Sequence, residues 1–105
     1  MLTMLQYPVG IHDFAVQMHA GAAVVSVAMQ NGKPYMWALS DKEAPLVEHR
    51  FVTIQTGEDT SEEIGDFLFV GTFQSPSGSL TFHLFDAGDG TGDGAEEDEE
   101  PGEGE

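Results

Sequence analysis

The sequence predicts an all-β domain, either an antiparallel sandwich or a small barrel of about six strands, followed by a disordered acidic tail. Segments rich in β-branched and aromatic residues recur roughly every ten to fifteen residues, separated by Gly, Pro and Asn-Gly turn signals. No segment has the length and periodicity of a long helix. The composition changes sharply at Asp86, and residues 86–105 contain ten acids and six glycines but no Lys or Arg. We therefore expect a β domain at residues 1–85 and a tail at residues 86–105 that buries too little apolar surface to fold.

The first two predicted strands lie at residues 3–8 and 13–18. Pro8 and Gly10 end the first of these segments. In the second segment apolar and polar or small residues alternate, with a period of two, which is typical of a half-buried strand.

The strongest local prediction is a hairpin over residues 23–39 that turns at Asn31-Gly32. Both residues tolerate positive φ, so a two-residue type I′ turn is expected. Both faces of this hairpin are largely apolar. Counting back from the turn predicts the cross-strand pairs Gln30 with Lys33, Ala28 with Tyr35, Ser26 with Trp37, and Val24 with Leu39.

Tyr35 and Trp37 lie on the same face of this hairpin and have two possible roles. Small residues opposite the two rings favour packing in the core. The alternative is that the rings are presented to a partner. Pro34 has no N–H to donate to a neighbouring strand, so we expect its end of the strand to lie at a sheet edge.

Later segments predict a strand at residues 48–56, an acidic loop at Gly57–Asp66 and a last hairpin of residues 67–74 and 80–85. The loop can hold one helical turn capped by Thr60 or Ser61. If Gln74 faces Leu80, His83 lies opposite Gly71, where the missing side chain leaves room for a ring. His83 is then expected to be a packed or hydrogen-bonded core residue.

The formal net charge of −16 limits the partners. The predicted domain contributes −6 and the tail −10, and the bases are Lys33, Lys42 and Arg50. Direct binding to nucleic acid is not expected, because phosphate contacts require clustered Lys and Arg, and an anionic membrane surface is disfavoured for the same reason. An acidic protein suits a partner with a basic surface, although such a charge can also serve solubility alone.

The sequence contains no recognisable catalytic, cofactor or metal motif. There is no cysteine, and the four histidines lack metal-ligand spacing. Phosphate-binding glycine motifs and a nucleophile motif are also absent. We therefore expect that the protein is not an enzyme and has no cofactor or metal. No basic and apolar signal peptide is apparent, and no segment reaches the roughly 18 to 20 apolar residues of a membrane span.

Four segments in order resemble a family of short, uncharacterised bacteriophage and prophage proteins. They are AAVVSVAMQNGKPYMWALSD (22–41), HRFVTIQTG (49–57), VGTFQ (70–74) and GSLTFHLF (78–85). The resemblance covers about residues 3–86. It implies a phage origin and thus the host cytoplasm as the site of action, but it brings no activity and no catalytic residues. The acidic tail departs from the usual members.

These observations favour a non-enzymatic phage accessory protein that acts by binding. It would inhibit a host protein, for instance in host takeover or counter-defence, by occupying a basic surface that normally binds nucleic acid. An aromatic edge would make the contact and the acidic residues would attract the partner. The expected contact residues are Tyr35, Trp37, Glu58, Asp59, Glu62, Glu63, Asp66, Glu96, Glu97, Asp98, Glu99 and Glu100.

Two alternatives remain open at this point. A homo-oligomer could sequester a nucleotide signal, with Lys33, Lys42 and Arg50 from several subunits as phosphate contacts. A virion component, such as a decoration protein, could instead add a strand through the edge at Pro34.

Overall fold

The computed structural model describes residues 1–90 and confirms an all-β fold. Within this range it contains seven strands, one more than expected, and one short 3-10 helix. These elements are β1 (Thr3–Pro8), β2 (Phe14–His19), β3 (Ala23–Gln30), β4 (Lys33–Ser40), β5 (Leu46–Gln55), η1 (Glu62–Asp66), β6 (Leu68–Gln74) and β7 (Thr81–Gly88). No described helix is long and apolar enough to cross a membrane.

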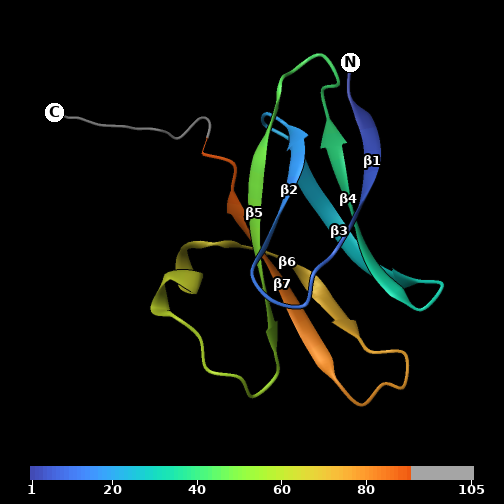
Figure 1. Ribbon diagram of the computed structural model, residues 1–105, viewed down its shortest axis with the longest axis vertical. Helices are drawn as coiled ribbons and strands as arrows, with labels where there is room; N and C mark the ends of the chain where they lie inside the picture. Colours follow the sequence, from blue (N-terminus) through green and yellow to red (C-terminus); the bar gives the residue numbers. More distant parts are fainter. Residues whose placement is uncertain (91–105) are drawn as a thin grey trace, which may run out of the picture.

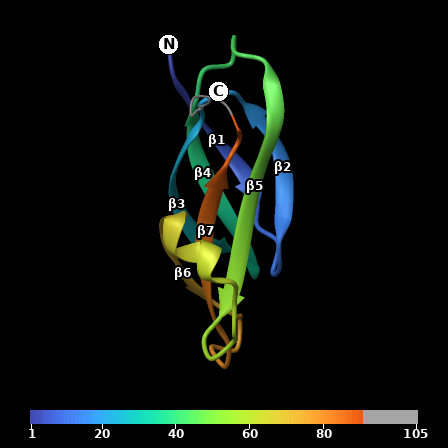
Figure 2. The same cartoon turned by 90° about the vertical axis from the view of Figure 1, so that its left-hand side faces the viewer.

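The strands form two antiparallel sheets that pack face to face as a sandwich (Figures 1 and 2). One sheet has the order β1-β4-β3 and the other has the order β2-β5-β7-β6. Strands β3 and β6, which are edges of different sheets, pack against each other and close one side of the sandwich. Strands β1 and β2 are the edges on the other side.

The core lies between the two sheets and follows the period-two alternation of the strands. Met36 and Ala38 of β4 are fully buried, as are Met18 of β2 and Leu84 of β7. Phe51 of β5 is 1% exposed and stacks against the ring of Phe14, with 5.2 Å between ring centroids. One face of each sheet is thus committed to the core, and the other face points outward.

The central hairpin has the predicted turn and most of the predicted register. Asn31 and Gly32 have φ of 55° and 80°, as a type I′ turn requires. The pairs from Gln30 with Lys33 to Ser26 with Trp37 are confirmed. A bulge at Val25 then shifts the pairing, so Val24 lies opposite Ala38 and the prediction of Leu39 is wrong.

The expectation of a sheet edge at Pro34 is also wrong. Strand β4 is the central strand of its sheet, between β1 and β3. The backbone N–H of Val9, just beyond β1, donates to the Pro34 carbonyl at 3.2 Å. The side of Pro34 that lacks a donor is therefore covered by the continuation of β1, and no strand can be added there.

The last hairpin is shifted by one residue from its predicted register. Gln74 pairs with Thr81, so His83 faces Thr72 and not Gly71. A shift of one residue moves a side chain to the opposite face of a sheet. His83 accordingly lies half-buried on the outer face, where its ring lies 2.7 Å from the Thr56 hydroxyl and 3.1 Å from that of Thr72. The prediction of a core histidine at this position is wrong.

Gly71 instead provides room for the opposing sheet. A Cβ atom placed on Gly71 would lie 2.8 Å from Cγ1 of Val27 on β3. This close approach lets the two edge strands β3 and β6 pack together. A glycine at position 71 leaves room for the side chain of Val27.

Strand β7 continues to Gly88, three residues beyond the expected end of the domain at residue 85. The acidic loop contains the expected helical turn, η1, and Ser61 is its cap: the Ser61 hydroxyl accepts the N–H of Glu63 at 3.2 Å. Residues 91–105, which include most of the predicted tail, lie outside the described residues.

Candidate functional site

The strongest candidate site is the outer face of the sheet β1-β4-β3, which we name the aromatic face. Tyr35 and Trp37 lie at its centre on β4, and their side chains point away from the core because Met36 and Ala38 point into it. The register places residues from both neighbouring strands beside them. The aromatic face consists of Met4, Gln6 and Pro8 from β1, Tyr35, Trp37 and Leu39 from β4, and Ala23, Ser26 and Ala28 from β3.

This position decides between the two roles considered for Trp37. The packing argument from Ser26 and Ala28 is wrong, because both small residues are themselves exposed and lie beside the rings on the outside. Trp37 and Tyr35 are half-buried by their neighbours and are not part of the core. Met4, which faces Leu39, is 49% exposed and extends the apolar surface to the edge of the sheet.

A polar bridge crosses the aromatic face. The Gln6 side-chain amide donates to the Gln30 amide oxygen at 2.6 Å and so joins β1 to β3 across β4. Because both glutamines are exposed, this bond is open to competition from water or from a ligand. It ties the two outer strands together without introducing a charge.

Charge is distributed unevenly along the described part of the chain. Residues 1–40 carry only Asp13 and Lys33 and are net neutral, apart from the amino terminus. Residues 41–90 carry ten acids against two bases, a net charge of −8. The residues of the aromatic face are therefore uncharged on a strongly acidic protein, and Lys33 lies at the start of β4.

The acidic loop lies away from the aromatic face. Helix η1 is placed over the outer side of the four-stranded sheet, on the opposite side of the sandwich from β1, β4 and β3 (Figures 1 and 2). Of the predicted contact residues, the structure therefore brings Tyr35 and Trp37 together and separates them from the loop acids Glu58, Asp59, Glu62, Glu63 and Asp66. The two rings and the loop acids therefore do not form one continuous surface. The predicted contacts Glu96, Glu97, Asp98, Glu99 and Glu100 lie outside the described residues.

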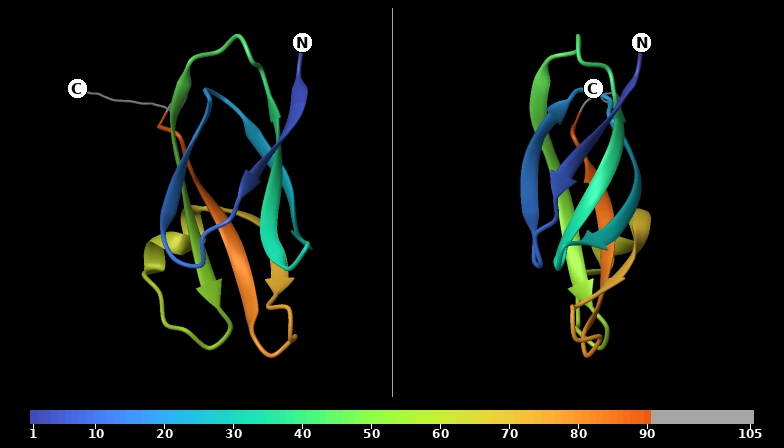
Figure 3. Two further views of the ribbon diagram at one scale, coloured as in Figure 1. Left: turned by 45° about the vertical axis from the view of Figure 1, so that its right-hand side comes forward. Right: turned by 90° about the vertical axis from the view of Figure 1, so that its right-hand side faces the viewer.

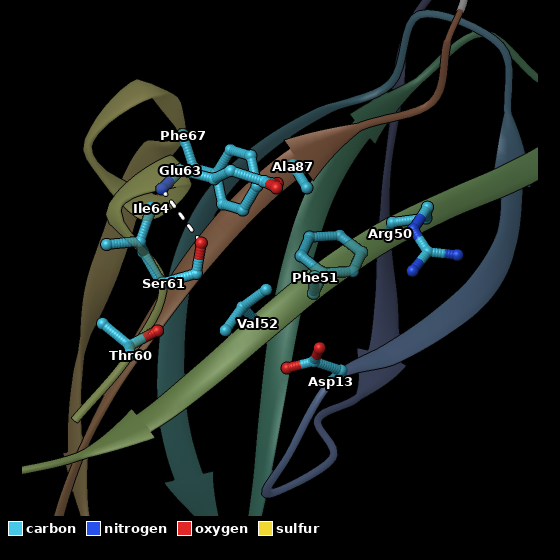
Figure 4. Close-up of a pocket in the computed structure, with 10 residues that line it drawn as sticks. All are labelled: Asp13, Arg50, Phe51, Val52, Thr60, Ser61, Glu63, Ile64, Phe67 and Ala87. Atoms are coloured by element: carbon cyan, nitrogen blue, oxygen red, sulfur yellow. Dashed lines mark hydrogen bonds between the residues drawn. The ribbon is translucent and has the colours of Figure 1, made fainter. Parts of the chain in front are cut away.

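A cavity of about 280 Å³ separates η1 from the sheet beneath it. Figure 4 shows Arg50 and Asp13 on one side of this cavity, and Thr60 and Ser61 on the other. Arg50 is exposed and forms no ion pair with a carboxylate of residues 1–90. Two acids, Asp13 and Glu63, also line the cavity, so it is not a strongly cationic site.

The three bases do not converge in one chain. Lys33 begins β4 and Lys42 follows its last residue by two, so the two lysines lie at opposite ends of this strand. Arg50 belongs to the other sheet. The described residues of a single chain therefore form no cluster of bases that could bind phosphate. Among residues 1–90 there is also no group of three metal-ligating side chains.

The most unusual buried group is one that the sequence did not reveal. His49 on β5 and Asp86 on β7 both point into the core, and His49 Nε2 lies 2.6 Å from Asp86 Oδ1. The His49 ring also stacks on Phe51, with 4.7 Å between centroids, and its Nδ1 is buried without a partner in the described residues. The alternation of Phe82 and Leu84, continued by two residues, indicates that Asp86 also faces the core. The acidic composition from Asp86 onward instead assigned this residue to the tail.

The buried pair has the geometry of a structural contact. A cavity lined by both residues is also lined by Asp66, Phe67 and Leu68, and no Ser, Thr, Cys or Lys of the described residues lines it. Asp86 Oδ1 also accepts the N–H of Gly88 at 2.7 Å, which holds the end of β7 in place. This arrangement joins the strands β5 and β7.

Comparisons with known proteins identify a family but no activity. No curated protein and no solved structure matches the chain. A family model described as a domain of unknown function, DUF7352, matches residues 1–93, which include every described strand. The chain therefore belongs to the DUF7352 family of uncharacterised domains.

Proposed function

We propose that this protein is a non-enzymatic binding protein that holds a basic partner protein on its aromatic face. The observation that carries the proposal is the outward position of Tyr35 and Trp37 on a charge-free sheet surface, next to the exposed Met4. Tyr, Trp and Met are enriched at the centre of protein interfaces, and charged residues are depleted there. Tyr and Trp also supply many of the residues that dominate binding energy.

The acids contribute at longer range. The described acids lie mainly on residues 41–90, and a net charge of −16 for the whole chain attracts a positively charged protein before contact. The contact itself is then made by uncharged side chains. This division predicts an association rate that falls with salt, because the Debye length shortens from about 10 Å at 0.1 M to about 3 Å at 1 M.

The nature of the partner follows from charge and from the resemblance to bacteriophage and prophage proteins. Host proteins that hold DNA or RNA present basic surfaces, and such a surface attracts a strongly acidic protein at long range. The proposal therefore places the partner among nucleic-acid-associated host proteins, in host takeover or counter-defence, and the site of action in the host cytoplasm. Direct binding to nucleic acid is not part of the proposal.

The test is a capture experiment with matched variants. The full chain is immobilised, exposed to bacterial lysate at low and high salt, and the bound proteins are identified by mass spectrometry. Trp37→Ser removes the central ring of the aromatic face. Leu68→Ser is the matched control, because Leu68 is 72% exposed on the other sheet. Far-ultraviolet circular dichroism confirms that both variants are folded.

The expected result is a set of basic proteins that bind the wild type and Leu68→Ser, bind Trp37→Ser at least about tenfold more weakly, and are released by high salt or by added DNA. If Trp37→Ser captured these proteins as well as the wild type does, the aromatic face would not be the binding surface. Captured proteins that are acidic, or that DNA does not displace, would contradict a partner with a nucleic-acid-binding surface.

A further inference from the structure

Among the described strands, β1 has one edge that pairs with no other strand. It pairs with β4 on one side, and no described strand pairs with it on the other (Figure 3). Because Val9 donates to Pro34, the alternation of an antiparallel ladder directs the backbone groups of Tyr7 and Leu5 toward β4. The backbone groups of Met4, Gln6 and Pro8 therefore point away from β4, to the open edge.

This edge lacks the features that usually prevent strands from pairing with other chains. Such features are charged side chains, bulges and covering segments. β1 carries no charged residue, and its pairing runs without a bulge from Thr3 to Pro8. By contrast, β3 and β6 each contain a bulge, and they cover each other. Pro8 is the only protective residue on β1, and it lies at the end of the strand.

The distribution of charge favours β1 over the other open edge, β2. Strand β2 pairs with β5, where Gln17 lies opposite Glu48 and Ala15 lies opposite Arg50, so charged side chains lie next to this edge. The segment of β4 beside β1 carries no charge from Pro34 to Ser40. Two copies of a chain with a charge of −16 can therefore meet along β1 without bringing acids of the described strands into contact.

We infer that β1 pairs antiparallel with β1 of a second copy, across a two-fold axis at Gln6, and so joins two three-stranded sheets into one of six strands. In this register each Gln6 N–H donates to the Gln6 carbonyl of the other copy. Each Met4 N–H donates to the Pro8 carbonyl of the other copy. Because Pro8 has no N–H, the Met4 carbonyl opposite it is left without a donor in this ladder. A two-fold axis makes the contact self-complementary and closed.

The consequence is a doubled aromatic face. Met4, Gln6 and Pro8 have their side chains on the same side of the sheet as Tyr35 and Trp37. Edge pairing therefore places the aromatic faces of both copies side by side on one continuous surface, with the four-stranded sheets behind it. The assembly does not depend on the proposed function, although it enlarges the surface that would serve it.

The test uses two substitutions at the same position. Gln6→Pro removes the edge donor at the centre of the pairing and leaves the ladder to β4 intact, since Gln6 and Trp37 are a non-hydrogen-bonded pair. Gln6→Thr is the matched control, because it keeps the backbone donor and loses the same side-chain bond to Gln30. The full chain of each form is studied by sedimentation equilibrium over a range of concentrations, at low and high salt.

We expect the wild type and Gln6→Thr to form dimers, and Gln6→Pro to associate at least about tenfold more weakly. Salt should strengthen the dimer, because it screens the repulsion between two acidic copies. Salt should instead weaken the binding of a basic partner. The two proposals therefore predict opposite effects of salt, and each can be contradicted without the other. A wild type that stays monomeric up to its solubility limit would overturn the inference, as would a Gln6→Pro variant that dimerises like the wild type.

A second measurement covers the case in which Gln6→Pro does not fold. Amide hydrogen exchange of the wild type is followed at high and low protein concentration. Protection of the Met4 and Gln6 amides that is lost on dilution supports the pairing. Rapid exchange of both amides at high concentration overturns it, because these two donors have no partner within the described monomer ladder.

Discussion

His49 and Asp86 meet inside the sandwich, where 2.6 Å separates Nε2 of the imidazole from Oδ1 of the carboxylate. The contact joins the middle of β5 to the C-terminal end of β7, and both side chains are at least nine-tenths buried. It brings together two residues 37 positions apart in the chain. The end of β7 is thereby held to the core by a polar contact in place of an apolar one.

The first prediction concerns this pair. Asp86→Ala leaves both ring nitrogens of His49 buried without a partner, which should lower the free energy of unfolding by about 1–3 kcal/mol. Urea denaturation followed by circular dichroism measures the change. Asp59→Ala, at an exposed loop position, is the control and should stay within about 0.5 kcal/mol of the wild type. Equal stability of the two variants would show that the pair does not stabilise the fold.

The second prediction concerns the end of the domain. A chain ending at residue 90 keeps Asp86 and the whole of β7 and is the reference for a shorter chain. A chain ending at residue 85 loses Asp86 and the pairs of Asp86 and Gly88 with β5. It should unfold at a lower urea concentration, by at least as much as Asp86→Ala. Equal midpoints for both truncations would place the end of the domain at residue 85.

The third prediction concerns the contact between the two sheets at β3 and β6. Gly71→Ala puts a methyl group 2.8 Å from Cγ1 of Val27, an overlap that should cost about 1–3 kcal/mol. Combining it with Val27→Ala restores the space, so the double variant should be more stable than the sum of the two single changes predicts. Gly65→Ala is the matched control, because nothing lies within 4 Å of its Cβ position. Additive changes would indicate that the overlap is relieved elsewhere.

The fourth prediction uses Trp37, the single tryptophan of the chain. Its place on the aromatic face should make its fluorescence accessible to acrylamide, a neutral quencher that the negative charge does not repel. Quenching of the native protein should lie between that of a fully buried indole and that of the urea-unfolded chain. Native fluorescence that acrylamide barely quenches would place the ring in the core and contradict the aromatic face.

Local chemistry explains why much of the fold was predictable. Period-two alternation located the strands, and Asn31-Gly32 determined both the turn and the register of the pairs next to it. The cap of η1 at Ser61 followed from a local preference for hydroxyl side chains. Each of these features depends on residues close together in the chain, so no knowledge of packing was needed.

The errors arose where distant segments decide the outcome. The bulge at Val25 and the shift of the last hairpin depend on how each strand fits its sheet, which no local pattern encodes. Asp86 resembles the tail in composition, and only the position of His49 on a neighbouring strand makes its burial favourable. A hairpin that is apolar on both faces likewise does not reveal which face the second sheet will cover.

The sequence by itself determined the class of fold, the central turn and the acidic character of the chain, because alternation, backbone preference and net charge are properties of short segments or of composition. Only the tertiary structure decided that Met36 and Ala38 face the core while Tyr35 and Trp37 face outward, and that β1 is an open edge. Both outcomes depend on which strands become neighbours. Pairing and sheet packing bury one face of a strand and leave the other available for binding, and they involve residues far apart in the chain.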